Sequence, residues 1–133
     1  MAADSDTVCP ALVTDRDLAR WMPVYGYEVD YGDPWPHAAT VPSGSSHVAA
    51  WSLTPVAGLD ANDQLLQAQE VADVSTFART GNPTAHFEPA WPQFNTTAEL
   101  MSLAPGDDSQ VMSVAQIALD HNCGFWDEVA PKP

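Results

Sequence analysis

The chain has 133 residues, of which 45% are apolar and 17% charged, and this composition is typical of a globular protein rather than a disordered one. Eighteen acidic residues against four basic ones give a formal net charge of −14. A surface of this sign repels phosphate backbones and anionic lipids, so we expect neither nucleic acid nor a membrane surface as a partner. No run reaches the ~18 apolar residues of a membrane span.

The first half of the sequence predicts a short helix, a strand and a loop. Thr14–Met22 fits a helix that Thr14 caps and Pro23 ends. Pro23–Asp30 has the β-branched and aromatic content of a strand. The segment 31–46 is rich in Gly, Pro and Ser, which indicates a loop.

The second half predicts a long helix, a second strand and a closing helix. Asp60–Arg79 is the longest helical segment, with Asp60 as N-cap and Gly81 after its end. Its apolar residues cover more than one face, so it needs contacts on two sides. Glu99–Ala104 fits a strand, and 114–129 fits the closing helix.

The set of predicted helices and strands is small for an independent domain. About two strands and three to four helices are predicted, and a two-stranded sheet is marginal by itself. Residues 1–133 contain neither a repeat nor a linker, so we expect a single piece without a second domain. Met1–Ala11 has neither the basic nor the apolar region of a signal peptide, and the sequence does not predict where the chain is located.

Candidate catalytic and metal-binding residues are few. The four histidines, His37, His47, His86 and His121, lack paired metal spacing, and His121 with Cys123 makes only a weak His-x-Cys signal. We therefore predict no metal and no cofactor. No Gly-x-Ser-x-Gly occurs, so a nucleophile elbow is absent from this sequence. The serines at 43, 45 and 46, next to His47, are better explained as loop hydroxyls than as a Ser–His pair.

The two cysteines, Cys9 and Cys123, leave two interpretations open. A disulfide between them would close 114 positions and contribute about 4–5 kcal/mol in the chain-entropy model. The alternative is two buried thiols in a reducing cell. Asn95-Thr96-Thr97 is a formal glycosylation acceptor, although such triplets also arise by chance.

Six stretches of the sequence form an ordered set of motifs. They are Cys9-Pro10 with the following helix and the strand 23–29; Ser45-Ser46-His47; Phe77-Ala78-Arg79-Thr80-Gly81-Asn82-Pro83; Trp91-Pro92-Gln93-Phe94; Leu100–Gly106; and His121-Asn122-Cys123-Gly124-Phe125-Trp126-Asp127. In this order and spacing, over about residues 4–130, they resemble the type B carboxylesterases, the family that includes the cholinesterases.

This resemblance implies a fold and residue roles. The fold would be the C-terminal portion of an α/β-hydrolase, with an incomplete sheet. His47 would be the general base of a serine esterase. Cys9 and Cys123 would form the family's late disulfide, which indicates an oxidising compartment for the parent enzyme. The sequence departs from the family at Ala50, where an acidic residue is common, and in 51–55, where a hydrophobic run is usual.

Three hypotheses follow from these observations. The first is the C-terminal portion of a carboxylic-ester hydrolase, inactive alone because the serine, the acid and the oxyanion hole are elsewhere. The second is a non-catalytic, cholinesterase-like module that binds a partner, and the third is an unrelated acidic binding module. In the first, the partners are a small-molecule ester and the missing N-terminal lobe, or a second copy of the chain.

The first hypothesis makes three structural predictions. The Cα atoms of Cys9 and Cys123 should lie within about 7 Å of each other. His47 should lie in an exposed loop. Apolar surface should be open along the strand pair and along the long helix.

Overall fold

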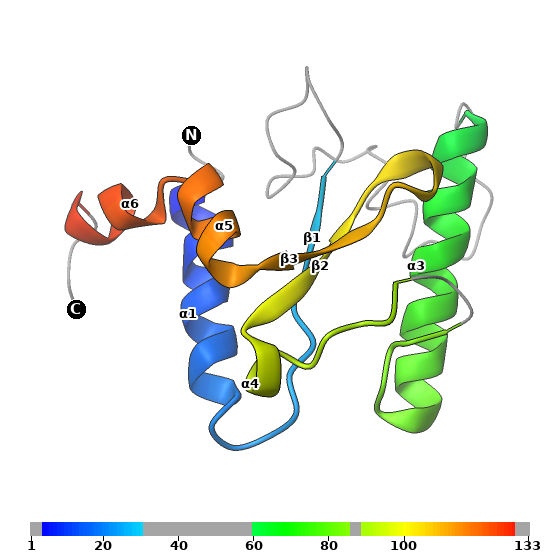
Figure 1. The fold of residues 1–133 in the computed structure, drawn as a ribbon, viewed down its shortest axis with the longest axis horizontal. Helices are drawn as coiled ribbons and strands as arrows, with labels where there is room; N and C mark the ends of the chain where they lie inside the picture. The colour runs from blue at the N-terminus through cyan, green and yellow to red at the C-terminus, as the bar shows by residue number, and fades with distance from the viewer. Residues whose placement is uncertain (1–3, 31–59, 86–88, 130–133) are drawn as a thin grey trace.

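The computed structural model describes residues 4–30, 60–85 and 89–129. A π-helical turn (Asp4–Val8) precedes the first helix, and a 3₁₀ turn (Pro105–Asp107) joins the last two strands. The remaining elements, shown in Figure 1, are α1 (Cys9–Leu18), β1 (Tyr27–Val29), α3 (Ala61–Thr80), α4 (Phe94–Thr97), β2 (Glu99–Leu103), β3 (Gln110–Ser113), α5 (Val114–Asp120) and α6 (Cys123–Val129).

The helix α1 begins earlier than the sequence predicted, and Thr14 is not its cap. Pro10 lies in the first turn, where its missing N–H costs nothing. Thr14 lies inside the helix, where its hydroxyl donates to the main-chain oxygen of Pro10 at 2.9 Å. The prediction of Thr14–Met22 was therefore wrong at both ends, because a proline opens α1 and the chain turns after Leu18.

Three strands form a mixed sheet in the order β1-β2-β3. β1 pairs with β2 in parallel, with Val29 opposite Leu103, and β2 pairs with β3 antiparallel. The predicted strand 23–30 contains β1 but is longer than it, and Glu99–Ala104 matches β2 within one residue. The sequence did not predict β3, which has only four residues. The result is a partial α/β fold.

The long helix α3 is the element that the sequence predicted best. The Asp60 side chain accepts hydrogen bonds from the N–H groups of Asn62 and Asp63, and the Asp63 side chain accepts from Asp60 N–H, which completes a capping box. Gly81 ends the helix in the left-handed conformation, with φ of 76°. Local sequence suffices here because both ends are closed by residues next to the helix.

The predicted closing helix 114–129 is two helices, α5 and α6. Ser113 caps α5, its hydroxyl accepting from Gln116 N–H at 3.1 Å. The break falls at His121 and Asn122, and Asn122 has a φ of 52°. Asparagine tolerates this left-handed conformation better than most residues. The change of direction brings Cys123 to Cys9, which a continuous helix would not do.

Helices lie on both faces of the sheet (Figure 1). Side chains along β2 alternate, so that Leu100 faces α1 and α5 while Met101 and Leu103 face α3. Two apolar clusters result. The disulfide-side cluster consists of Cys9, Leu12, Phe94, Leu100, Val114, Ile117 and Cys123, and the α3-side cluster consists of Leu66, Met101 and Leu103.

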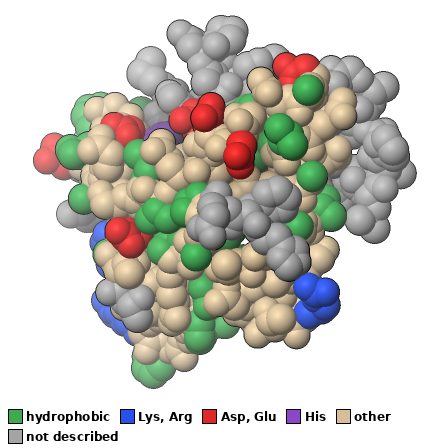
Figure 2. All heavy atoms as spheres, turned by 45° about the vertical axis from the view of Figure 1, so that its right-hand side comes forward, with side chains coloured by type: hydrophobic (Ala, Val, Ile, Leu, Met, Phe, Trp, Pro, Cys, Tyr) green, Lys and Arg blue, Asp and Glu red, His purple; other side chains and the backbone are tan. Residues whose placement is uncertain are grey.

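Apolar side chains are exposed on several helices and turns. Leu65, Val74 and Phe77 are exposed along α3, as predicted, and Figure 2 shows hydrophobic side chains at the surface on that side of the molecule. Trp21 is 86% exposed. The prediction was wrong for β2, whose residues from Leu100 to Leu103 are buried, because the two clusters cover both of its faces. None of the described helices is long and apolar enough to cross a membrane.

Candidate functional site

The parallel strands β1 and β2 end at one edge of the sheet. Val29 pairs with Leu103 at this edge, and Asp30 N–H donates to Leu103 O at 2.8 Å. The chain from 31 to 59 continues from this edge and rejoins the described part just before α3. In α/β sheets, ligands bind outside the carboxyl ends of the strands. His47, with its predicted exposed loop, and the neighbouring serines lie outside the described residues.

Cys9 and Cys123 form a disulfide that joins the first residue of α1 to the first residue of α6. Their Cα atoms are 5.4 Å apart, within the limit of about 7 Å set by disulfide geometry. Both cysteines are buried in the disulfide-side cluster. The pairing implied by the resemblance is therefore confirmed, and the alternative of two free thiols does not hold for this structure.

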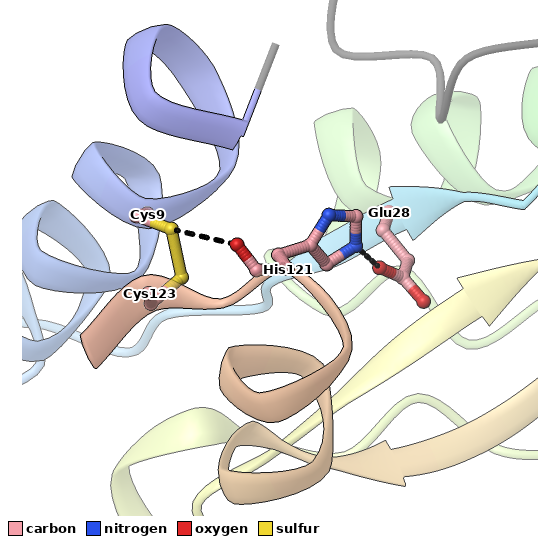
Figure 3. Close-up of a disulfide and its surroundings, with 4 residues drawn as sticks. All are labelled: Cys9, Glu28, His121 and Cys123. Carbon is pink, nitrogen blue, oxygen red and sulfur yellow. Dashed lines mark hydrogen bonds and ion pairs between the residues drawn. A yellow bond between two sulfur atoms is a disulfide. The ribbon is translucent and has the colours of Figure 1, made fainter. Parts of the chain in front are cut away.

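His121 contacts both the disulfide and the strand β1, as Figure 3 shows. Its Nε2 lies 3.3 Å from Oε2 of Glu28, and the two side chains are only 7% and 18% exposed. Its main-chain oxygen lies 3.9 Å from the Cys9 sulfur. A disulfide sulfur has no proton to donate, so this second contact is packing. An imidazole so placed either donates a hydrogen bond to the carboxylate or, when protonated, forms an ion pair with it.

A second polar cluster lies on the opposite face, between α3 and the sheet. Asp73 is 2% exposed and accepts a hydrogen bond from Nε1 of Trp91 at 3.0 Å. Burial raises the pKa of Asp73, hydrogen bonds from Trp91 and the Ala85 main chain oppose the rise, and the charge of Glu70 adds to it. This carboxyl therefore holds its proton more tightly than an exposed aspartate does.

Tyr27, the first residue of β1, contacts the polar cluster of Asp73 and Trp91. Its ring packs edge-to-face on Trp91, with centroids 5.8 Å apart. Burial raises the pKa of Tyr27, and the charge of Glu70 raises it further. Adjacent residues of β1 thus contact opposite sides of the molecule: Glu28 contacts His121, and Tyr27 contacts Trp91.

Asn95 fixes the connection between α1 and β1. Its Nδ2 donates to the main-chain oxygens of Ala19 and Met22, and its Oδ1 accepts from Val24 N–H at 2.8 Å. Both amide hydrogens are thus engaged. A glycan would replace one of them, so the triplet that starts at Asn95 does not present a free acceptor in the folded chain.

No group of three or more His, Cys, Asp or Glu side chains suited to a metal ion occurs among the described residues. The sulfur of Cys123 is bonded to Cys9, so the His121-x-Cys123 pair cannot bind a metal through a thiolate.

Sequence reasoning missed the two polar contacts that flank β1. His121 was considered only as a metal ligand and as part of a motif, and Glu28 was not singled out. On α3, the face toward the sheet is made by Leu66, Gln69, Glu70 and Asp73, which are all buried. These residues are three and four positions apart, which places them on one face of a helix. The sequence shows this spacing, but the prediction considered only the apolar residues of the helix.

The chain was compared with models of known protein families. The model described as the carboxylesterase family matches residues 1–126 of the chain. A comparison with curated proteins gives no significant match.

Proposed function

The chain belongs to the carboxylesterase family, and from this premise we propose that it is the C-terminal portion of a serine-dependent carboxylic-ester hydrolase. The observation that carries the proposal is the family match, which covers 126 of the 133 residues and includes His47. The disulfide expected from the resemblance and the mixed sheet with helices on both faces support it. In this proposal, the three strands are the last part of an α/β-hydrolase sheet.

His47 is the general base in the proposed reaction. Its imidazole takes the proton of a serine hydroxyl as that oxygen attacks the ester carbonyl, and then gives the proton to the leaving alcohol. The support from this chain is positional, because the segment with His47 follows the carboxyl end of β1. The serine, the acid and the oxyanion hole come from a separate portion, since this sequence contains no nucleophile elbow.

The chain alone is inactive in this proposal. When a triad member is removed from a complete enzyme, the rate enhancement that remains comes from the oxyanion hole and from substrate binding. The family's oxyanion-hole glycines precede the part of the fold that this chain represents. Mixing an ester with residues 1–133 should therefore give no more hydrolysis than free imidazole at the same concentration.

The exposed apolar side chains support a missing partner. Trp21 is 86% exposed and Leu119 is 72% exposed, and Leu65 and Phe77 are exposed on α3. These side chains lie on separate segments, and each is available for contact with a covering lobe or a second copy of the chain. We therefore expect the isolated chain to associate with itself or to need the N-terminal lobe. Gel filtration tests this, and elution as a compact monomer would contradict it.

A complementation assay tests the catalytic role. Residues 1–133 are mixed with a carboxylesterase truncated before its own Cys-Pro helix, and hydrolysis of p-nitrophenyl acetate is followed. We expect turnover with the wild-type chain and a loss of at least about 10³-fold with His47→Ala. His37→Ala, which removes a histidine of the same segment, is the matched control and should keep the activity.

Each outcome of this assay separates the hypotheses. Equal activity with His47→Ala would overturn the assigned role of His47. A stable complex without turnover in any variant would overturn the hydrolase proposal and favour the partner-binding module.

A further inference from the structure

His121 connects three parts of the chain that are distant in sequence. Its main-chain N–H donates to Ile117 O at 3.0 Å and so closes α5. Its main-chain oxygen packs on the sulfur of Cys9, and its imidazole reaches Glu28 on β1 (Figure 3). The disulfide lies two residues further along the chain, at Cys123. A change at the disulfide therefore acts on the segment that holds this imidazole.

Glu28 lies on the short strand β1. β1 has three residues and pairs, within the described part of the chain, with β2 alone. A strand this short depends on side-chain contacts as well as on main-chain pairing. Tyr27 holds one face of β1 through Trp91. Glu28 holds the other face through His121, across 93 positions of sequence.

We propose that the Glu28–His121 contact couples the oxidation state of the Cys9–Cys123 disulfide to the pairing of β1 with β2. In the oxidised protein, the disulfide holds the corner between α5 and α6 in place, and His121 stays against Glu28. In the reduced protein, α6 is free to move from α1, and β1 loses this contact on one face. The proposal goes beyond the hydrolase function and does not depend on it.

The redox step uses an ordinary thiol. Two molecules of glutathione supply two electrons and two protons; the bond between the sulfurs of Cys9 and Cys123 breaks, both become thiols, and glutathione leaves as its disulfide. Coupling between two sites is reciprocal. If the disulfide strengthens the Glu28–His121 contact, then the contact must also favour the oxidised form.

A redox titration in glutathione buffers at pH 7 tests this reciprocity. We expect Glu28→Gln and His121→Gln each to make the disulfide about three- to tenfold easier to reduce, the range for the net effect of one ordinary hydrogen bond. The double variant should show no larger shift than either single variant, because both remove the same contact. Asp120→Asn, which removes an exposed charge next to His121, is the matched control and should leave the midpoint unchanged.

Hydrogen exchange tests the effect on β1. The amides of Asp30 and Met101 cross between β1 and β2, donating to Leu103 O and Gly26 O. Reduction should speed their exchange in the wild type about as much as Glu28→Gln does in the oxidised protein. Reducing the disulfide in the Glu28→Gln variant should then speed the exchange of these amides little further.

Two results would overturn the proposal. One is an unchanged midpoint in both single variants. The other is an equal acceleration of these amides on reduction with and without Glu28, which would mean that the disulfide acts on β1 by general destabilisation alone.

Discussion

The helices α1 and α5 cover one face of the sheet with apolar side chains next to a disulfide, whereas α3 covers the other with one buried apolar residue, Leu66, and three buried polar ones. On the first face, stability comes mainly from apolar burial and a covalent cross-link, and the Glu28–His121 contact also lies there. On the second face, Asp73 and Glu70 are buried carboxyl groups, and burial raises the pKa of Asp73. The sheet thus separates a side that holds a redox-sensitive bond from a side whose packing includes two buried carboxyl groups.

Removing the disulfide should have the largest effect and should confirm that the first face depends on it. Replacing both Cys9 and Cys123 by serine is expected to lower the free energy of unfolding by about 4–5 kcal/mol, because the bond closes nearly the whole chain. Urea unfolding measures this. Reduced wild-type protein is the control and should match the variant. A loss below about 1 kcal/mol would show that the cluster holds this face without the bond.

Asn95→Asp should have the next largest effect, and on the same side of the molecule. A carboxylate keeps the acceptor for Val24 N–H but cannot donate to Ala19 O and Met22 O. Two lost hydrogen bonds cost about 2 kcal/mol, measured by urea unfolding. Asn82→Asp is the control, since Asn82 Oδ1 accepts from Thr84 N–H and an aspartate retains that role. If both substitutions lower the free energy of unfolding equally, the hydrogen bonds that Asn95 donates do not stabilise the turn after α1.

Asp73→Asn tests the pH dependence of the α3 side. Because the folded-state pKa of Asp73 is raised, its contribution to stability is fully present below the unfolded pKa and is lost as pH rises through the folded value. Asparagine keeps an acceptor for Trp91 without the buried charge. We expect it to raise Tm by about 4 °C at pH 8, equivalent to about 1 kcal/mol, and to give no gain near pH 3.

The control for this prediction is Asp127→Asn, which neutralises an exposed carboxyl on α6 and should change Tm little at either pH. A decrease of Tm at pH 8 in Asp73→Asn would show that the charged hydrogen bond to Trp91 outweighs the cost of burying the charge.

Asp60→Ala should have an effect as small as that of Asp73→Asn, because it acts on one end of α3 only. It removes the acceptor for Asn62 and Asp63 N–H, and an N-cap of this kind contributes about 1 kcal/mol. Thermal unfolding measures the change. Asp17→Ala, which breaks an exposed ion pair with Arg20, is expected to cost less than about 0.5 kcal/mol. If the two substitutions cost the same, the capping box does not stabilise α3.

Prediction from sequence succeeded where neighbouring residues decide the structure. The ends of α3 follow from Asp60 and Gly81, which act within one turn of the helix. It failed at α1, where a helix opened by Pro10 was assigned to Thr14, and at β3, whose four residues carry little periodicity. The polar contacts of Glu28 and Asp73 were missed because their partners, His121 and Trp91, are 93 and 18 positions away.

The amino-acid sequence by itself determined the family, the long helix, the strand β2 and, through the family, the pairing of Cys9 with Cys123. Ordered motifs and local capping residues are properties of the chain as written, so they are visible without a structure. Only the tertiary structure decided that the closing helix breaks at Asn122, that Asn95 fixes the turn after α1, and that His121 lies between the disulfide and Glu28. These contacts depend on which distant segments the packing brings within a few ångströms, and pattern and spacing along the chain do not contain that information.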